Sequence, residues 1–374
     1  MKFGHLKLSG IIIKTGFNTL PMTRLTFLFL LLALPFSWAN AQGYETIITH
    51  IGDNNQLNIT QSGTGHKVDV LQNSSNSSGL QNNPMGFGIL NVPLSNLAVI
   101  EEHGDDHSVT VHQNGASTAK VFVGTESVPN SENTTTLHQM GDGNFAIQKI
   151  LGADANNNEL EVGQYGNDNF SWQFIDNGSH NKGEGTQAGS SNLIKQLIEG
   201  SYNDLEILQV GDNNKAYQWI RGSESELNEV LFEQFGDYNY ASLVITGSEN
   251  SFKSNQSGNS NRISGDKWFK GKAAGQTGSE NNIHVLQMGD DNAMTLNQIG
   301  SENSITGMSS FQGTTQMGNE NFLELNQVGE GNLTNGIQID QGNTANITQT
   351  GNFHHSHSLQ VGANNSALII QSNN

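Results

Sequence analysis

Residues 349–371 read Gln349-Thr-Gly-Asn-Phe-His-His-Ser-His-Ser-Leu-Gln360-Val-Gly-Ala-Asn-Asn-Ser-Ala-Leu-Ile-Ile-Gln371, with a glutamine at every eleventh position. The same step leads back from Gln349 to Gln338 and recurs near the N-terminus between Gln61 and Gln72. Self-similarity at a fixed short period is typical of proteins that stack one structural unit along an axis. The sequence therefore predicts a repeat architecture.

Each repeat combines a strand pattern with a turn pattern. Asn281-Asn-Ile-His-Val-Leu-Gln287 places apolar residues at every second position, which is the period of a β-strand with one buried face. The glutamine is followed by x-Gly-x-x-Asn, as in Gln209-Val-Gly-Asp-Asn-Asn214. Glycine and asparagine tolerate positive φ and favour tight turns. The unit is thus predicted to be a short strand followed by a tight turn.

Between residues 139 and 250 a second kind of arc alternates with the first. Isoleucine stands midway between successive glutamines, as at Ile150, Ile175 and Ile198. Two alternating arcs predict an all-β fold, a flattened two-sheet β-solenoid (a cross-β stack) of about 11-residue strand-turn arcs with two arcs per coil. One sheet would stack the glutamine arcs and the other the isoleucine arcs, with like residues about 4.8 Å apart. After residue 276 every arc carries glutamine, so both sheets would hold glutamine ladders.

Buried amide side chains are costly unless they are hydrogen-bonded, and stacked ladders of glutamine and asparagine satisfy one amide with the next. We therefore predict a structural role for three sets of residues. The ladder glutamines are Gln61, Gln72, Gln139, Gln164, Gln187, Gln209, Gln234, Gln256, Gln276, Gln287, Gln298, Gln316, Gln327, Gln338, Gln349, Gln360 and Gln371. The ladder asparagines are Asn144, Asn169, Asn192, Asn214, Asn239, Asn292, Asn321 and Asn365. The turn glycines are Gly141, Gly166, Gly189, Gly211, Gly236, Gly289, Gly300, Gly318, Gly329 and Gly362.

The pattern along the chain divides it into repeats and irregular segments. Residues 42–72 hold the first repeats, and 73–102 form an irregular insertion that contains Pro84 and Pro93. Solenoid repeats occupy 103–374, with an irregular piece at 115–133 and slippage near Lys267 and Thr306. No proline follows Pro129, as an uninterrupted stack requires, because proline cannot donate to a central strand.

The N-terminus reads as a secretory signal. Residues 22–41 begin with a basic Arg24, continue with an apolar run and end in Ala39-Asn40-Ala41, which predicts cleavage after Ala41. The apolar run is too short to favour a membrane span. Residues 1–21 precede this signal, and we interpret them as a non-native N-terminal extension, with Met22 as the start.

Composition excludes several classes of function. The formal net charge is −19, which argues against nucleic-acid binding because that relies on basic patches. Cysteine is absent, so stability must come from the stack and not from disulfides. The carboxylates are scattered through turns and outer strand positions, so we predict no enzyme and no catalytic residue, cofactor or metal.

Metal binding, calcium binding and disorder have weaker support in the sequence than a structural solenoid. His354, His355 and His357 could hold a metal, but an exposed turn explains them more simply. Asp53, Asp142, Asp212 and Asp290 recur in turns and could ligate calcium, but the nonapeptide of calcium-binding β-rolls is missing. The polar composition would also suit disorder, although disordered chains do not keep an apolar alternation in step with a glutamine period.

The unit Gln-x-Gly-x-x-Asn-x-(Ala or aliphatic)-x-x-x-Gln resembles the curlin repeat of curli, the extracellular amyloid fibres of bacteria. Gln287-Met-Gly-Asp-Asp-Asn-Ala-Met-Thr-Leu-Asn-Gln298 and residues 360–371 carry the resemblance, which covers roughly 50–72 and 103–374. It implies export through a dedicated outer-membrane pore with its accessory factors, assembly with itself and related curlin subunits, and roles in adhesion and biofilm matrix. The chain is much longer than a five-repeat subunit, and its alternate arcs carry isoleucine where the family often has glutamine.

The sequence thus predicts a structural subunit of a secreted curli-like fibre (pilus) at the bacterial surface. The repeats run to Gln371, three residues from the end, without a visible polar cap. Such an edge is a template for another chain, so we expect growth by edge-to-edge β-stacking. Whether the chain is the major subunit, a minor or nucleating subunit, or an accessory stays open. The alternative is a monomeric β-solenoid surface adhesin or binding module.

Overall fold

The computed structural model describes residues 45–51, 55–73, 96–264, 274–306 and 313–373, together with the backbone of two short strands at 7–8 and 11–13. The expected signal peptide at 22–41, its cleavage site, and the rest of 1–21 lie outside the described residues. None of the described residues belongs to a helix long and apolar enough to span a membrane.

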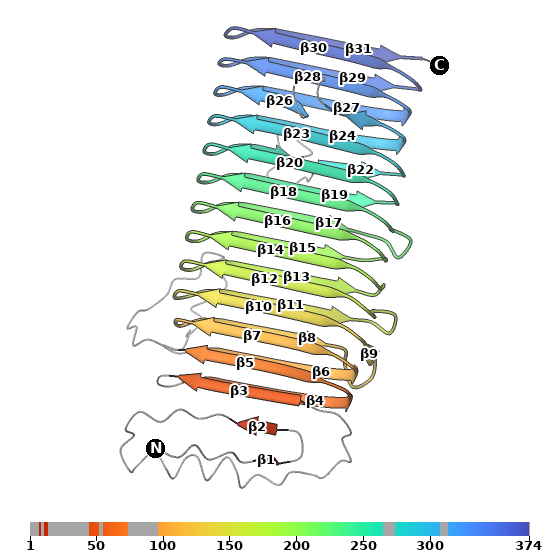
Figure 1. Ribbon diagram of the computed structural model, residues 1–374. Helices are drawn as coiled ribbons and strands as arrows, with labels where there is room; N and C mark the ends of the chain where they lie inside the picture. The colour runs from red at the N-terminus through yellow and green to blue at the C-terminus, as the bar shows by residue number, and fades with distance from the viewer. Residues whose placement is uncertain are drawn as a thin grey trace.

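The described residues form two sheets, called sheet A and sheet B here, and no helix (Figure 1). Sheet A contains β1 (Lys7–Leu8), β2 (Ile11–Ile13), β3 (Glu45–Ile51), β5 (Lys67–Asn73), β7 (Ser108–Asn114), β10 (Thr134–Met140), β12 (Glu159–Tyr165), β14 (Lys182–Ala188), β16 (Asp204–Val210), β18 (Glu229–Phe235), β20 (Ser251–Ser257), β23 (Asn282–Met288), β25 (Ser304–Ile305), β26 (Thr314–Met317), β28 (Leu333–Ile339) and β30 (His355–Val361). Sheet B contains β4 (Gln56–Thr64), β6 (Leu97–Asp105), β8 (Thr118–Val123), β9 (Asn130–Ser131), β11 (Phe145–Leu151), β13 (Phe170–Asp176), β15 (Leu193–Ile198), β17 (Lys215–Ile220), β19 (Tyr240–Thr246), β21 (Arg262–Ser264), β22 (Ala274–Thr277), β24 (Ala293–Ser301), β27 (Phe322–Glu330), β29 (Thr344–Thr350) and β31 (Ser366–Ser372).

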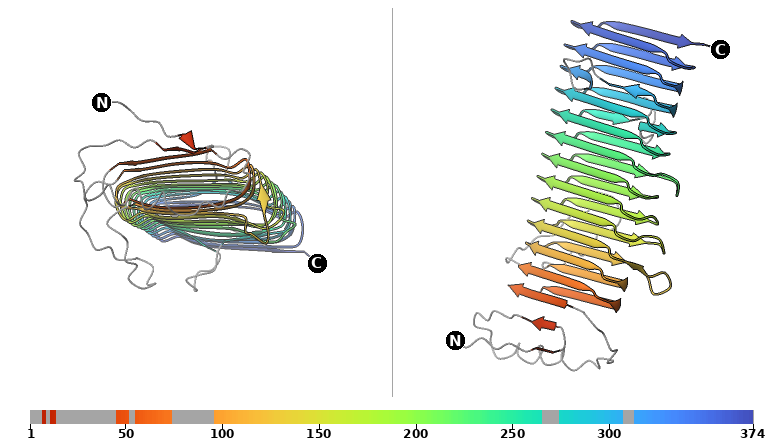
Figure 2. Two further views of the ribbon diagram at one scale, coloured as in Figure 1. Left: turned by 90° about the horizontal axis from the view of Figure 1, so that it is seen from below. Right: turned by 45° about the vertical axis from the view of Figure 1, so that its right-hand side comes forward.

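From β3 onward the chain alternates between the two sheets, so that each coil adds one level to sheet A and one to sheet B. Two short strands share a level in three places, as β8 and β9 do beside β6. Every strand pairs in parallel with the strand one coil away, as β12 does with β14 and β13 with β15. Seen end-on, the coils superimpose as a flattened ring with the two sheets as its long walls (Figure 2, left). The two-sheet β-solenoid predicted from the sequence is confirmed.

Like residues stack on like residues. In sheet A, Gln164 aligns with Gln187, and the same column continues through Gln209. In sheet B, Ile150 aligns with Ile175, and the isoleucine column ends where Ile245 aligns with Gln276. The isoleucine and glutamine arcs therefore share one inward column of sheet B, which changes its side chain along the axis.

The core lies between the walls and is one side chain thick from each sheet. Burial alternates along the strands, as in β10, because successive side chains point to opposite faces. Inward positions carry aliphatic residues such as Leu137, Ile150 and Val162, all with no exposed surface. Buried apolar surface stabilises the folded chain by about 25 cal/mol per Å². The other inward positions carry amides and small residues such as Thr135 and Ser171.

Two predicted irregular segments are narrower than expected. β6 begins at Leu97, inside the segment predicted at 73–102, and pairs with β4 in register over its whole length. β8 lies inside the segment predicted at 115–133 and pairs with β6 and β11. Both arcs were missed because Glu102 and Val123 stand where the pattern predicts glutamine or isoleucine.

The slippage near Lys267 and Thr306 reflects two insertions within single strands. β21 and β22 flank residues 265–273 and both pair with β19, so together they fill one level of sheet B. β25 and β26 flank residues 307–312 and both pair with β23 in sheet A. The strand therefore resumes in register after each insertion, and the stack is not shifted.

The predicted turn glycines share one backbone conformation. All ten have φ between +94° and +124°, a region that other residues rarely adopt. At Gly211 the constraint is also steric, because a β-carbon there would lie 2.2 Å from the carbonyl oxygen of Gly236 in the next coil. The close spacing of coils at the turns therefore depends on the missing side chain.

We predict that Gly211→Ala destabilises the chain by about 1–3 kcal/mol, since it combines an unfavourable φ with a backbone clash. The free energy of unfolding in a denaturant titration measures this. Gly275→Ala is the matched control, because Gly275 has no positive φ and its β-carbon would meet only the Asn297 side chain, at 3.3 Å. Equal effects of the two substitutions would contradict the account of the turns.

Candidate functional site: buried amide ladders and the open end of the stack

A glutamine ladder runs through sheet A without interruption. Each side-chain Nε2 donates to Oε1 of the glutamine one coil closer to the C-terminus, with N–O distances of 2.8–3.0 Å. Its members are Gln72, Gln113, Gln139, Gln164, Gln187, Gln209, Gln234, Gln256, Gln287, Gln316, Gln338 and Gln360. Of these, only Gln113 is missing from the set assigned from the sequence.

The second hydrogen of each amide ties the ladder to the opposite sheet. Nε2 of Gln139 also donates to the carbonyl oxygen of Thr118, at 3.0 Å, at the start of a sheet B strand. Nε2 of Gln209 donates to Leu193 in the same way, at 3.2 Å. Each buried amide is thus bonded along the axis and across the core, which offsets the cost of removing it from water.

The remaining predicted glutamines lie in sheet B. Gln276, Gln298, Gln327, Gln349 and Gln371 form a second ladder with N–O distances of 2.8–3.1 Å. Gln61 is separated from them by the isoleucine column and donates to Glu102 instead, at 2.7 Å.

A third glutamine ladder was missed from the sequence. Gln148, Gln173, Gln196 and Gln218 stack two residues before the isoleucine column of sheet B, with N–O distances of 2.7–3.1 Å, and all four are fully buried. Their amides also donate to carbonyl oxygens of sheet A, such as those of Glu161 and Gly183 for Gln173. The signal was present, since a glutamine stands two residues before each isoleucine from 150 to 220.

Two asparagine ladders hold the turns. The first follows the sheet A strands, where Asn169 donates from both its backbone N and Nδ2 to Oδ1 of Asn144 (3.1 Å each) and from Nδ2 to the carbonyl of Gly189 (2.8 Å). One asparagine therefore joins three coils. All eight predicted asparagines occupy this ladder, together with Asn261 and Asn343.

The second asparagine ladder follows the sheet B strands and was not predicted. It contains Asn133, Asn158, Asn181, Asn203, Asn228, Asn250, Asn281, Asn303 and Asn332, with the same bonding. Asn281, Asn303 and Asn332 follow the Gln-x-Gly-x-x-Asn motif, as in Gln298-Ile-Gly-Ser-Glu-Asn303, so the sequence carries a signal for them. The earlier members have no glutamine five residues before them, as in Ser-Glu-Ser-Glu-Leu-Asn228.

The two kinds of ladder have opposite polarity. Between side chains, glutamine amides donate toward the C-terminal end of the stack, whereas asparagine amides donate toward its N-terminal end. The other asparagine bond, to a glycine carbonyl, runs toward the C-terminal end. Within the described residues, the C-terminal coil therefore presents Gln360 and Gln371 with Nε2 bonded across the core, to the carbonyl oxygens of Thr344 and His355, and to no further glutamine. The two ends of the rod are thus chemically different and complementary.

The terminal coils are also where the core is incompletely covered. Leu57 and Ile59 at the N-terminal end, and Ala367 and Ile369 at the C-terminal end, are the partly buried apolar residues that pack against the core cluster. Within the described residues, β31 pairs only with β29, and β30 pairs along its length only with β28. The C-terminal coil is therefore an open edge of both sheets.

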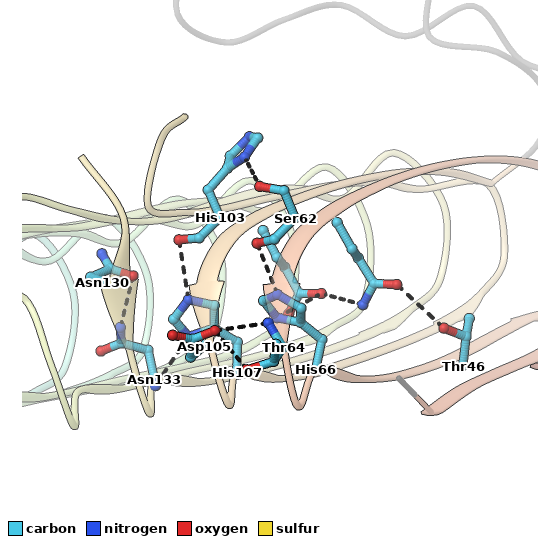
Figure 3. Close-up of polar contacts among 11 residues, drawn as sticks. Thr46, Ser62, Thr64, His66, His103, Asp105, His107, Asn130 and Asn133 are labelled. Atoms are coloured by element: carbon cyan, nitrogen blue, oxygen red, sulfur yellow. Dashed lines mark hydrogen bonds and ion pairs between the residues drawn. The ribbon is translucent and has the colours of Figure 1, made fainter. Parts of the chain in front are cut away.

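Near the N-terminal end, His66 and His107 (Figure 3) and Glu102 interrupt the ladders. His66 and His107 occupy the positions before sheet A strands that asparagine takes elsewhere, and their rings lie 5.2 Å apart. Nδ1 of His107 accepts from the backbone N of Asn133, the next residue in that column. Oε2 of Glu102 accepts from Gln61, whereas its Oε1 has no hydrogen-bond partner among the described residues.

Burial controls the charge of this cluster. It raises the pKa of Glu102 to about 8 and lowers the pKa of His107 to about 4. Burial also lowers the pKa of His66, whose Nδ1 lies 4.0 Å from Oε2 of Glu102. At neutral pH the three side chains are therefore mainly uncharged, as a dry core requires.

The residues considered for metal binding are dispersed. His355 and His357 alternate on the outer face of β30, and the backbone N of His354 donates to Asn332 in the second asparagine ladder. Asp142 and Asp212 accept from backbone N atoms of the preceding coil, at 2.9 and 2.7 Å, as Asp290 does at 2.7 Å. Asp53 lies outside the described residues. No group of three or more histidine, aspartate or glutamate side chains in the described ranges could hold a metal ion.

Comparison with known proteins identifies the repeat. The family model of the Curlin associated repeat matches the chain at residues 131–166 and again at 341–372. The first match spans β10 to β12 and the second spans β29 to β31, so each contains strands of both sheets. No curated protein matches the chain.

We predict that Gln209→Leu destabilises the stack more than Gln218→Leu. The first removes a member with a glutamine on both sides, so the amide of Gln187 loses its acceptor and that of Gln234 loses its donor. The second removes the last member of its ladder, so Gln196 is the only described glutamine that loses a partner. Each buried unsatisfied group costs about 1–3 kcal/mol, and denaturant unfolding of both variants measures the difference. Equal losses would show that the axial bonds contribute little.

We predict that Glu102→Gln stabilises the first coils above neutral pH. The pKa of Glu102 is raised in the folded state, so folding stability falls as pH rises from the unfolded value of about 4.5 to about 8. Glutamine removes this dependence and restores an amide to the column. Hydrogen exchange of β4 and β6 amides at pH 5 and pH 8 measures the effect.

Glu101→Gln is the control for this prediction, because Glu101 lies on the exposed outer face of the same strand. We expect no change in protection from it at either pH. His107 titrates in all three proteins, so its contribution cancels in the comparison. Equal pH dependence of the wild type and Glu102→Gln would contradict the burial of an uncharged glutamic acid.

Proposed function

Since this chain is a curlin-repeat protein, we propose that it is a structural subunit of a curli-type amyloid fibre, secreted and assembled at the bacterial surface. The observation that carries the proposal is the C-terminal coil, where, within the described residues, β30 and β31 are each paired along one side only and the ladders through Gln360 and Gln371 stop. An uncapped parallel edge pairs readily with another strand. In this proposal the chain acts by assembly and not as an enzyme.

End-to-end stacking brings matching residues together. Aligning β31 of one copy with β4 of the next pairs the inward Ala367 with Leu57 and Ile369 with Ile59, the residues left partly exposed at the two ends. The same alignment sets Gln371 over Gln61. Glutamine amides donate toward the C-terminal direction throughout the chain, so Nε2 of Gln371 would donate to the first coil of the next copy.

The sheet A strands continue the same alignment. β30 over β3 pairs Gln360 with His50 and His355 with Glu45, which adds an opposite-charge pair when the histidine is protonated. In the full chain the backbone of β2 pairs in parallel with β3. Cleavage after Ala41 would remove β2 and free the edge of β3, so we propose that the N-terminal end becomes available only after export.

The family resemblance extends the proposal to the route and the setting. We propose passage through an outer-membrane secretion pore with its accessory factors, assembly with itself and related curlin subunits, and service in adhesion and biofilm matrix. A chain without cysteine can be threaded unfolded, and its negative charge keeps free chains apart before assembly. The same charge makes nucleic acid an unsuitable partner.

Growth kinetics of residues 42–374 test the proposal. We expect thioflavin-T fluorescence to rise after a lag, and preformed fibre to remove the lag. Ile369→Lys should slow elongation by at least about tenfold, because an unpaired charge in the end-to-end contact costs more than about 1.4 kcal/mol.

Leu368→Lys is the matched control, since Leu368 is the adjacent residue, points outward and is 69% exposed. It should elongate like the wild type. A chain that stays monomeric with and without seeds would instead favour a monomeric surface adhesin, and equal slowing by both substitutions would show that growth does not proceed through the inward face of β31.

A further inference from the structure

The outer face of sheet B changes character between β8 and β21. Its three central outward columns carry aromatic, aliphatic and basic residues there and no acidic residue. We call this the aromatic–basic face. It comprises Lys120, Phe122, Phe145, Ile147, Lys149, Phe170, Trp172, Phe174, Leu193, Lys195, Leu197, Lys215, Tyr217, Trp219, Tyr240, Val244 and Arg262, together with small polar residues.

The cations of this face are held over rings of the same or adjacent coils. Nζ of Lys149 lies 5.3 Å from the ring centroid of Phe122, and Nζ of Lys195 lies 5.9 Å from that of Tyr217. Arg262 stands over Tyr240 at 5.1 Å. No ion pair joins these cations to a carboxylate in the described part of the chain. The face therefore presents ordered positive charge on an apolar surface, in a protein of strongly negative net charge.

The opposite wall has the reverse character at the same axial level. Glu161, Glu184 and Glu206 stack in register on the outer faces of β12, β14 and β16. Asp204 and Glu229 align in the adjacent outward column. We call the outer surface of β12 to β18 the acidic face. Like charges directly opposite one another on a sheet destabilise it, so this column is costly in an isolated rod.

The electrostatics of the acidic face reflect this crowding. Burial raises the pKa of Glu206, and the neighbouring Glu184 and Asp204 raise it further. Burial likewise raises the pKa of Asp204, with contributions from Glu184 and Glu229. Lys182 and Lys253 neutralise part of the surface by pairing with Glu184 and Glu229. A second source of positive charge would relieve the remaining repulsion.

Apolar surface lies beside the charge on both faces. At the edge of the acidic face Tyr165 is 44% exposed and Val210 is 39% exposed, in one column with Phe235. The aromatic–basic face offers Trp172 and Trp219 next to its lysines. Contact between the two faces would thus bury apolar surface and pair opposite charges at once.

We propose that the aromatic–basic face of one rod docks laterally on the acidic face of a second copy of this chain. Both faces belong to the same coils, so two parallel rods match level for level, with Trp172, Lys195 and Tyr217 of one rod facing Glu161, Glu184 and Glu206 of the other. Identical spacing of the coils keeps the rows in step along the axis.

The contact uses two different surfaces of the subunit, which lie on opposite walls of the flattened ring (Figure 2, left). A contact between unlike surfaces that does not close by rotation repeats without limit. The proposed contact therefore predicts flat ribbons in which many filaments lie side by side, and not isolated pairs of filaments. Ribbon formation rests on the proposed function, because a long filament places many coils in the lateral contact and each coil adds to it.

Charge-swap variants of residues 42–374 test the inference by electron microscopy of preformed filaments. The wild type should form ribbons at low ionic strength and separate into single filaments toward about 1 M salt, where the Debye length falls to about 3 Å. Lys149→Glu with Lys195→Glu should give single filaments, as should Glu161→Lys with Glu206→Lys. Mixing these two kinds of filament should restore ribbons, because each reversed face then meets an oppositely charged partner.

Lys67→Glu is the matched control for Lys149→Glu alone, since both reverse one lysine but Lys67 lies on β5, outside the aromatic–basic and acidic faces. It should retain ribbons. Ribbons that persist in the first variant, or mixtures that stay single, would overturn the proposal. Single wild-type filaments that bind an added polyanion would overturn it too, because they would assign the aromatic–basic face to a free anionic polymer.

Sedimentation velocity of the unassembled protein tests the lateral contact separately from fibre growth. If no filaments form, the wild type and the variants are compared as soluble rods by sedimentation velocity at low ionic strength. The wild type should then self-associate, whereas Lys149→Glu with Lys195→Glu should sediment as a monomer. Identical sedimentation of the two proteins would overturn the lateral contact even without fibre growth.

Discussion

A buried side-chain amide needs hydrogen-bond partners for its carbonyl and both N–H groups, and in this protein the axial partner comes from the same residue type one coil away. The core is one side chain thick from each sheet, and amides occupy many of its inward positions beside aliphatic side chains. Water could satisfy them only by wetting the core. Exact register between coils is therefore a condition for folding, because a slip of one residue would send every inward side chain to the outer face.

This constraint explains both the regularity of the chain and the places where it relaxes. Insertions are accepted at 74–95, 265–273 and 307–312, because the described strands on either side of each segment stay in register with the neighbouring coils. The isoleucine column of sheet B has no amide side chains. From Ile150 to Ile220, the third glutamine ladder, Gln148 to Gln218, supplies amides two residues earlier in each strand. At Glu102 the rule is broken by an acid that burial keeps protonated, next to His66.

Much of the fold could be predicted from the sequence, because a period in the sequence maps directly onto a spacing in the structure. The glutamines of the Gln-x-Gly-x-x-Asn motif and the first asparagine ladder follow from that motif alone. In the second asparagine ladder the motif finds only the last three members, because the earlier ones have no glutamine five residues before them. The third glutamine ladder has a signal of its own, a glutamine two residues before each isoleucine from 150 to 220, which the motif does not contain. The histidine and glutamate cluster was also beyond sequence reasoning, since His66, Glu102 and His107 come together across separate coils and a break at 74–95.

The outer surface is not constrained by the need to satisfy buried amides, so its side chains vary more than those of the core. Stacking aligns equivalent residues on the outer face as well as in the core. A preference for one type of side chain in an outward column therefore produces a continuous stripe of that type along the axis. The aromatic–basic and acidic faces are such stripes, on opposite walls of the same coils. A β-solenoid can therefore present one kind of surface at its ends, suited to end-to-end stacking, and another along its sides, suited to lateral contact.

The central claim is that glutamine amides of successive coils are bonded to one another inside the rod. Solid-state NMR of the assembled protein, with glutamine labelled at the side-chain nitrogen and carbonyl carbon, tests it most directly. The account predicts through-space contacts from the amide nitrogen of one glutamine to the carbonyl carbon of the next, together with side-chain amide protons that exchange slowly with water. Glutamine amides that exchange as freely as in an unfolded chain, without such contacts, would contradict it.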